Sequence, residues 1–166
     1  MSKKLIRTAT DSPCLADCIQ NLPLPKDIPT CYKVNTNGDT IVLGLEGSAN
    51  KVGVGVLKYS PGGHNESNGY YHILANPRKT FIAPTGQGFL PKQTAIHHQN
   101  HIVALVKTAL LEAFPGEEHP ETLLSAICFT KGPGMGAPLQ SCAVCARTLS
   151  LLWGIPLCAV NHCVGK

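Results

Sequence analysis

Three short strand-like segments precede the first helical segment of this 166-residue sequence, and a strand and a helix then alternate. The strand-like segments are apolar runs bounded by turn residues, whereas the helical ones repeat apolar residues every three or four positions. In chain order, the sequence predicts strands over 41–45, 52–57 and 70–75, a helix over 94–113, a strand over 124–130, a helix over 137–153 and a strand over 156–161. The first three strands predict an antiparallel meander, and the later ones require crossover helices.

This order of elements predicts the fold class. A meander followed by crossover helices is the pattern of a ribonuclease-H-like α/β lobe, and two such lobes form the actin/Hsp70-like (ASKHA) and sugar-kinase architecture. The predicted elements account for one lobe, so we expect the second lobe to be absent from this chain. The helix over 94–113 has a single apolar stripe. The helix over 137–153 is apolar nearly all round, which predicts burial between layers or against a partner.

Residues 1–39 differ from the lobe predicted over 40–166. They hold four prolines and no sustained periodicity, which predicts an irregular N-terminal extension. Arg7 is the single arginine there and Asp11 is close to it, whereas mitochondrial presequences are rich in arginine and poor in acids. The net charge of +4 permits a polyanionic partner without demanding one. No apolar run approaches the roughly 18 residues of a membrane span.

The chain contains eight cysteines. The apolar core of a secretory signal peptide is missing, so we expect reduced thiols. Cys142 and Cys145 have the CxxC spacing of zinc or redox sites, but no second pair lies at finger distance. Because they fall in a segment predicted as buried helix, packing is favoured over chemistry. Cys14 and Cys18 give a weaker signal still.

A glycine-rich strand–turn–strand stretch over 44–55 is the first candidate site. Backbone N–H groups in a turn of small residues can face a phosphate, because no side chain blocks the approach. Ser48 and Lys51 would add a hydroxyl and a positive charge, and Glu46 at a strand end would hold a metal-bound water. An ordinary glycine-rich hairpin explains the same pattern equally well, so both interpretations stay open.

Three glycines, Gly132, Gly134 and Gly136, lead into the second predicted helix. The free N–H groups and dipole of a helix N-terminus favour an anion, so phosphate proximity is slightly preferred over a tight turn. The segment lacks the GK[ST] end of a Walker loop and does not match GxGxxG. Lys131, within it, joins Glu46 as a candidate catalytic residue.

The histidines offer two candidate sets of metal ligands, a cluster in the first predicted helix and the single His162. His97 and His101 share a helix face and His98 adjoins them, but no HExxH frame follows, so surface or interface histidines are favoured over ligands. His162 ends the last predicted strand, where open sheets bind their ligands, although a single histidine is more often structural. Spacing predicts a second ligand at position 166, which is Lys166.

Several motifs, taken together, are shared with one family. They cover 44–51 (GLEGSANK), 76–80, 88–91, 97–98, 130–139 (TKGPGMGAPL), 146–149 and 160–165. The set resembles the catalytic subunit of the KEOPS (EKC) complex, the tRNA threonylcarbamoyladenosine synthases, formerly described as glycoproteases or O-sialoglycoprotein endopeptidases. The likeness runs from about 41 to 165, and the EGSANK and KGPGMGAP forms are similar to those of the archaeal and eukaryotic cytosolic branch.

The resemblance implies transfer of a threonylcarbamoyl group from threonylcarbamoyl-adenylate to the adenosine next to the anticodon, in tRNAs that read codons beginning with A. It also implies one iron or zinc ion, held in the family by two histidines four residues apart and an aspartate of the second lobe. The first histidine falls on His162 and the second on Lys166, which offers no lone pair when protonated. We therefore expect weak metal binding and no product from this chain alone.

Two hypotheses follow from the resemblance. In the first, the chain is the N-terminal lobe of a transferase that continues past Lys166; in the second, it is a stand-alone lobe that binds KEOPS subunits without catalysis. The implied partners are a small dimerising subunit on helices 94–113 and 137–153, a kinase subunit and tRNA, with no membrane. The implied location is the cytoplasm and nucleus. Phosphate-loop residues typical of sugar kinases are not evident, and no nucleophile–base pair supports a protease.

Overall fold

The computed structural model describes residues 38–62 and 69–165. The elements in chain order are β1 (Thr40–Glu46), β2 (Lys51–Ser60), β3 (Tyr70–Ala75), β4 (Arg78–Thr80), α2 (Pro91–Ala113), the 3₁₀-helix η2 (Pro120–Leu123), β5 (Ala126–Gly132), α3 (Gly136–Trp153) and β6 (Leu157–Asn161). All but two residues of the predicted extension over 1–39, and Lys166, lie outside the described residues. Neither of the long helices in the described part combines the length and apolarity needed to cross a membrane.

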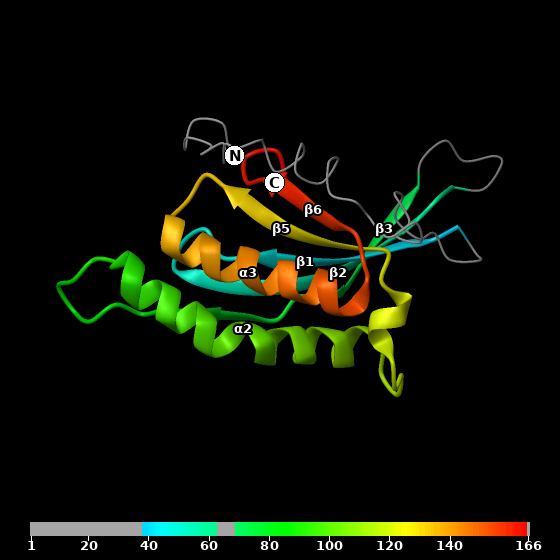
Figure 1. Ribbon diagram of the computed structural model, residues 1–166, viewed down its shortest axis with the longest axis horizontal. Coiled ribbons are helices and arrows are strands. Elements are labelled where there is room, and N and C mark those ends of the chain that lie inside the picture. The colour runs from blue at the N-terminus through cyan, green and yellow to red at the C-terminus, as the bar shows by residue number, and fades with distance from the viewer. Residues whose placement is uncertain (1–37, 63–68, 166) are drawn as a thin grey trace, which may run out of the picture.

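The strands form one sheet in the order β3-β2-β1-β5-β6, and β4 pairs with β2 (Figure 1). β1, β2 and β3 are antiparallel neighbours, as the meander predicted. β5 runs parallel to β1, and β6 runs parallel to β5, because α3 carries the chain back between them. This order confirms the predicted ribonuclease-H-like α/β lobe and leaves β6 at one edge of the sheet.

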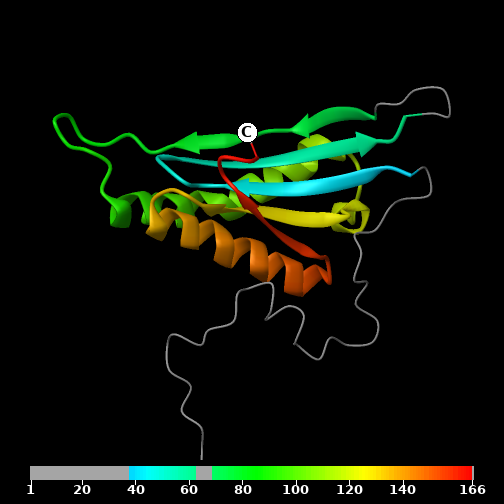
Figure 2. The ribbon, with the colours of Figure 1, turned by 90° about the horizontal axis from the view of Figure 1, so that it is seen from above.

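Both long helices lie side by side on the same face of the sheet (Figure 2). β1 and β2 alternate buried and partly buried residues, so every second side chain points to the helices. Leu43 and Val54 on that face meet Ile102 and Ala109 of α2 and Ala146 of α3, all almost completely buried. Each fully buried leucine, isoleucine or valine contributes about 1.5–3 kcal/mol, so this face holds the core. Within the described residues the opposite face has no helix on it.

Within the described residues α3 is not buried between layers, so only the other predicted alternative, cover by a partner, stays open. Cys142 and Ala146 are fully buried, but Val144, Leu151 and Leu152 are 58%, 75% and 72% exposed. The apolar composition of a helix indicates that several faces avoid water, but it does not say whether this chain supplies the cover. An exposed apolar strip therefore runs along α3.

The connector over 76–91 contains regular structure that its composition did not predict. β4 pairs with the start of β2, with Thr80 opposite Lys51 and Arg78 opposite Gly53. A strand of three residues is too short to show alternation. α2 begins at Pro91 rather than at 94, since proline suits the first turn of a helix. The predicted end of α3 is confirmed, because Gly154 caps it with a left-handed φ of 63°.

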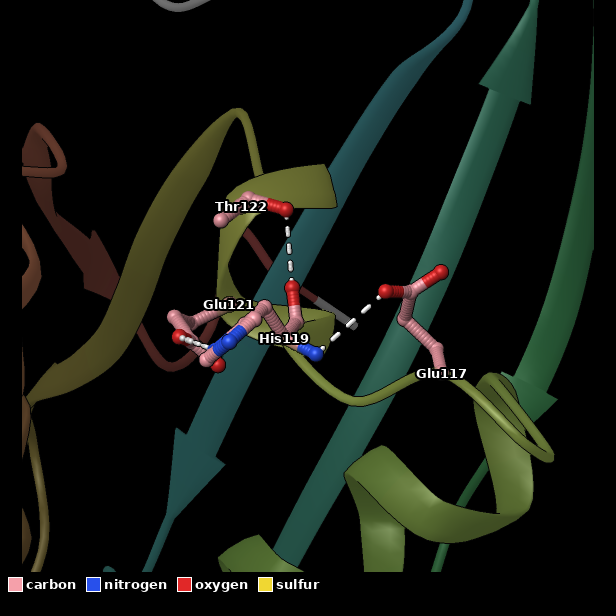
Figure 3. A network of polar contacts seen from close by, with 4 residues as sticks. All are labelled: Glu117, His119, Glu121 and Thr122. Atoms are coloured by element: carbon pink, nitrogen blue, oxygen red, sulfur yellow. Dashed lines mark hydrogen bonds and ion pairs between the residues drawn. The ribbon is translucent and has the colours of Figure 1, made fainter.

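A second unpredicted element, η2, lies in the connection from α2 to β5. The Thr122 hydroxyl donates a hydrogen bond of 2.7 Å to the His119 carbonyl, and the His119 backbone N–H donates one of 3.3 Å to Glu117 Oε1 (Figure 3). The His119 Nδ1 atom lies 3.3 Å from Glu121 Oε1. These exposed local contacts organise the turn before β5 starts.

Candidate functional site

A hollow of about 690 Å³ lies on the face of the sheet opposite the helices, at the carboxyl ends of β1, β5 and β6. Its floor is formed partly by Gly44 and Gly55, which are paired across β1 and β2 and leave the backbone bare. Polar side chains from four segments surround it: Glu46, Ser48, Lys51, Arg78, Thr130 and His162. Carboxyl ends of parallel strands are where open α/β sheets bind ligands.

Glu46 and Ser48 form the centre of this site. The Ser48 backbone N–H donates a hydrogen bond of 2.8 Å to Glu46 Oε1, and the Ser48 hydroxyl donates to the same oxygen. Ser48 is buried, and its own carbonyl accepts a hydrogen bond of 2.7 Å from the backbone N–H of Met135. The serine therefore holds the carboxylate in place, and a phosphate-binding role for its hydroxyl stays a prediction.

His162 reaches the same carboxylate from β6. Its Nδ1 atom lies 3.6 Å from Glu46 Oε2, and its backbone N–H donates a hydrogen bond of 2.9 Å to the Gly132 carbonyl. Burial raises the pKa of Glu46, but the hydrogen bonds of Ser48, the Thr130 hydroxyl and the charge of His162 outweigh it. The pKa of Glu46 therefore lies below its ordinary value, and the group is a carboxylate at neutral pH.

Two basic side chains face the hollow from the other side. Lys51 starts β2, and β4 places Arg78 beside it because Arg78 pairs with Gly53. Lys51 was predicted from the sequence, whereas Arg78 and Thr130 were quoted there only within shared motifs. The signal that points to Arg78 is its place directly after the Asn76-Pro77 turn that ends β3.

The loop over 131–136 packs against the β1–β2 turn rather than lining the hollow. A Cβ atom on Gly134 would lie 2.6 Å from the Cβ of Ser48, so the close approach requires glycine there. Gly132, Gly136 and Lys131 do not line the hollow, and Lys131 is exposed. Phosphate proximity of the three glycines and a catalytic role for Lys131 stay predictions.

The three clustered histidines have different environments. The prediction of a surface or interface position is wrong for His98, which is fully buried under the β1–β2 turn. His97 packs its ring on those of Phe81 and His101, at centroid distances of 5.6 and 4.7 Å. Burial lowers the pKa of His98 and favours the neutral imidazole. The nearby backbone of Ala49 raises this pKa but does not outweigh burial. The buried His98 Nε2 atom has no hydrogen-bond partner among the described residues.

Cys142 supports the same turn from α3. It is completely buried, and burial, with the nearby charge of Glu46 as a smaller cause, raises the pKa of its thiol to about 12. Burial also raises the pKa of Cys145. Both cysteines are free thiols that pack in or against the core, as the packing interpretation of the CxxC spacing expects, and the metal and redox alternatives stay untested.

The described residues do not make a complete metal site. Over 38–62 and 69–165, no group of three or more histidine, cysteine, aspartate or glutamate side chains is arranged to hold an ion. His162 offers one nitrogen, and Glu46 beside it already accepts hydrogen bonds from Ser48. Iron or zinc needs about four ligands, so this part of the chain supplies a fraction of a coordination sphere.

The sheet order defines one lobe of the actin/Hsp70-like class, and the carboxylate–imidazole pair lies at the ends of its parallel strands. Residues 71–166 match the TsaD family, described as tRNA N6-adenosine threonylcarbamoyltransferase. The match covers more than half of the sequence, and the chain belongs to this family.

Curated relatives agree with this assignment. A tRNA N6-adenosine threonylcarbamoyltransferase of Eremothecium gossypii is 55% identical over 130 residues, covering 75% of this chain and 33% of the relative. The protein of the same name from Aspergillus clavatus is 57% identical over 125 residues, covering 75% and 32%. The chain thus spans about a third of the length of the curated relatives it matches.

Solved structures give more distant likenesses. YeaZ from Pseudomonas aeruginosa has a TM-score of 0.47 at 18% identity, covering 74% of this chain and 43% of that one. RuvC of Thermus thermophilus has a TM-score of 0.44 at 12% identity, covering 74% and 62%.

Proposed function

We propose that this protein modifies tRNA by transferring a threonylcarbamoyl group from threonylcarbamoyl-adenylate to the adenosine next to the anticodon, in tRNAs that read codons beginning with A. The observation that carries the proposal is membership of a family described by this transfer, together with relatives of that name matching three quarters of the chain. Because the chain spans about a third of those relatives, the lobe supplies one wall of the reaction site.

The side chains around the hollow have distinct roles in this proposal. A carboxylate whose pKa lies below the usual range is a weak base, so Glu46 orients the attacking amino group as an acceptor rather than deprotonating it. Lys51 and Arg78 bring positive charge to the same hollow, which suits the phosphate of the adenylate donor. Lys131, exposed outside the hollow, is the weaker of the two catalytic candidates.

We further propose that the whole protein binds one iron or zinc ion with His162 as a ligand. Such an ion supplies Lewis-acid polarisation of a carbonyl group. The part of the chain that the structure describes offers it the His162 imidazole, whose Nδ1 side faces Glu46. A carboxylate beside one ring nitrogen favours the proton there and leaves the other nitrogen free to bind.

The proposed protein partners are KEOPS subunits, and the proposed location is the cytoplasm and nucleus. A small dimerising subunit would cover the apolar strip that α2 and α3 expose. Val144, Leu151 and Leu152 of α3 and Val103 and Leu111 of α2 support this, since each is at least 58% exposed. Contiguous exposed apolar surface commonly marks a protein interface. The kinase subunit and tRNA complete the set of proposed partners.

The experiment combines the chain, and any longer product of its transcript, with the other KEOPS subunits, threonylcarbamoyl-adenylate and tRNA. Mass spectrometry of the digested tRNA detects threonylcarbamoyladenosine. We expect product from a form that continues into a second lobe and none from the 166-residue chain. In the form that gives product, Glu46→Gln should lower the yield at least tenfold, whereas Glu112→Gln on the exposed side of α2 should not change it.

A second candidate function, a non-catalytic binding module, is favoured by the same exposed strip on α2 and α3. It predicts binding of the small subunit by the 166-residue chain and a stop codon directly after Lys166. Product formed by this chain with the other subunits would contradict both the module and the need for a second lobe.

A further inference from the structure

Two cysteines face each other on the uncovered side of the sheet. Cys128 of β5 pairs with Cys158 of β6 in the parallel register. Cys128 also pairs with Gly44 of β1, so it points to the same side as the glycine floor of the hollow, which it lines. Directly paired residues on neighbouring strands point to the same face of a sheet. The two thiols are therefore neighbours on the face that no helix of the described residues covers.

The distance between the strands suits a covalent link. Neighbouring strands lie about 4.7–4.9 Å apart, and disulfides join Cα atoms about 4.4–6.8 Å apart. β6 is at the edge of the sheet, so it is free to make the small adjustment that the bond geometry requires. Both cysteines are free thiols in the structure.

The two thiols differ in their access to solvent. Cys158 is exposed and Cys128 is half-buried beneath it. Burial, with the charge and hydrogen bond of Cys158, raises the pKa of Cys128 to about 12. Because Cys158 is the more exposed thiol, it would react first with an oxidant from solvent. The half-buried Cys128 would then react with the oxidised Cys158 in a second step.

We propose that Cys128 and Cys158 form an oxidisable dithiol, a modification site for hydroperoxides beside the hollow that Cys128 lines. The proposal rests on the register and exposure of the two residues, and it stands independently of the proposed function.

The chemistry needs one hydroperoxide and no other reagent. The Cys158 sulfur attacks one peroxide oxygen, the O–O bond breaks, an alcohol or water leaves, and Cys158 becomes a sulfenic acid. The Cys128 sulfur then attacks the Cys158 sulfur, an S–S bond forms, the S–O bond of the sulfenic acid breaks, and its hydroxyl group leaves as water with the thiol proton of Cys128. Two thiols are oxidised, and the peroxide is reduced. The new bond fixes β6, which leads into His162, against β5.

The test treats the 166-residue chain with equimolar hydrogen peroxide, blocks free thiols by alkylation and digests the protein with trypsin without reduction. Tryptic cleavage places Cys128 in peptide 108–131, Cys158 in peptide 148–166, and Cys142 with Cys145 in peptide 132–147. We expect a cross-link between 108–131 and 148–166 that dithiothreitol reverses, and fragmentation spectra that place the link at Cys158 rather than Cys163.

Three variants sharpen the test. Cys158→Ser should abolish the cross-link at an exposed position, where the fold tolerates the change, while Cys163→Ser and the matched control Cys145→Ser should keep it. A link from Cys158 to Cys163, Cys14, Cys18 or Cys31 would overturn the proposal. So would further oxidation of Cys158 to sulfinic acid while Cys128 is recovered as the alkylated thiol.

Discussion

Replacing Gly47 by alanine tests how the helices support the β1–β2 turn between Glu46 and Ser48. The added methyl would lie 2.8 Å from Cδ2 of His98 and closer still to Sγ of Cys142. Both side chains are 0% exposed, so neither can swing into solvent to make room. Overpacking of this kind costs about 1–3 kcal/mol. We expect Gly47→Ala to lower the free energy of unfolding by about 2 kcal/mol and Tm by about 4–8 °C.

A double-mutant cycle identifies the cause. Cys142→Ala removes the sulfur that meets the new methyl, and we expect it alone to cost about 1 kcal/mol. In the double variant the loss in free energy of unfolding should be about 1 kcal/mol smaller than the sum of the losses of the two single variants, because the clash is partly relieved. The recovery stays partial since His98 remains in place. Gly136→Ala is the matched control, because nothing lies within 4 Å of a Cβ atom there.

The assay is urea unfolding in reducing buffer, followed by circular dichroism and by the fluorescence of Trp153, the single tryptophan. The control should stay within about 0.5 kcal/mol of the wild type. If Gly47→Ala also stays within that range, or if the double variant is additive, then α2 and α3 do not press on the turn as described.

Three further predictions concern single groups. Because the pKa of Glu46 is lowered, its ionised form stabilises the fold above the ordinary value of 4.5, and this contribution is lost as pH falls through the lower, folded-state pKa. Unfolding free energies of Glu46→Gln should accordingly depend less on pH in acid than those of the wild type, and equal slopes would contradict this. Cys142, with a thiol pKa raised to about 12, should resist iodoacetamide at pH 8 in the folded chain, whereas exposed Cys163 reacts, as peptide mapping will show. Leu151→Asp with Leu152→Asp should leave Tm within a few degrees, since both side chains are mostly exposed, yet abolish co-purification with the small KEOPS subunit.

Much of the fold was predictable because local patterns carried it. A continuous apolar run indicated β1, and alternation of glycine with valine indicated β2. Proline and glycine at opposite ends bounded α3, with Gly154 in a left-handed cap. β4 was not predictable, because three residues show no period and its pairing with β2 is a contact distant in sequence. The composition of α3 predicted burial between layers or against a partner and could not choose between them, because it does not reveal which face another chain covers.

The candidate site was predicted in pieces rather than as a unit. Glu46 and His162 were each selected for lying at a strand end, but their 3.6 Å separation follows from the parallel arrangement of β1, β5 and β6. The burial of His98 was missed because one histidine in a helix with an apolar stripe gives no sign of what packs above it. Ser48 was predicted to offer its hydroxyl to a phosphate; in the structure that hydroxyl donates to Glu46, a contact that the sequence did not indicate, and the phosphate role stays a prediction.

The position of β6 has a practical consequence for handling this chain. The strand reads Leu-Cys-Ala-Val-Asn, without a charged residue, and among the described strands it pairs with β5 alone. Charged residues, prolines or bulges along the edge keep natural edge strands from pairing with one another. β6 carries no charged residue. Over residues 38–62 and 69–165 this edge is open to pairing with a second copy, and we expect purified samples to self-associate as concentration rises. Ala159→Lys, at an exposed position of this strand, would reduce that tendency.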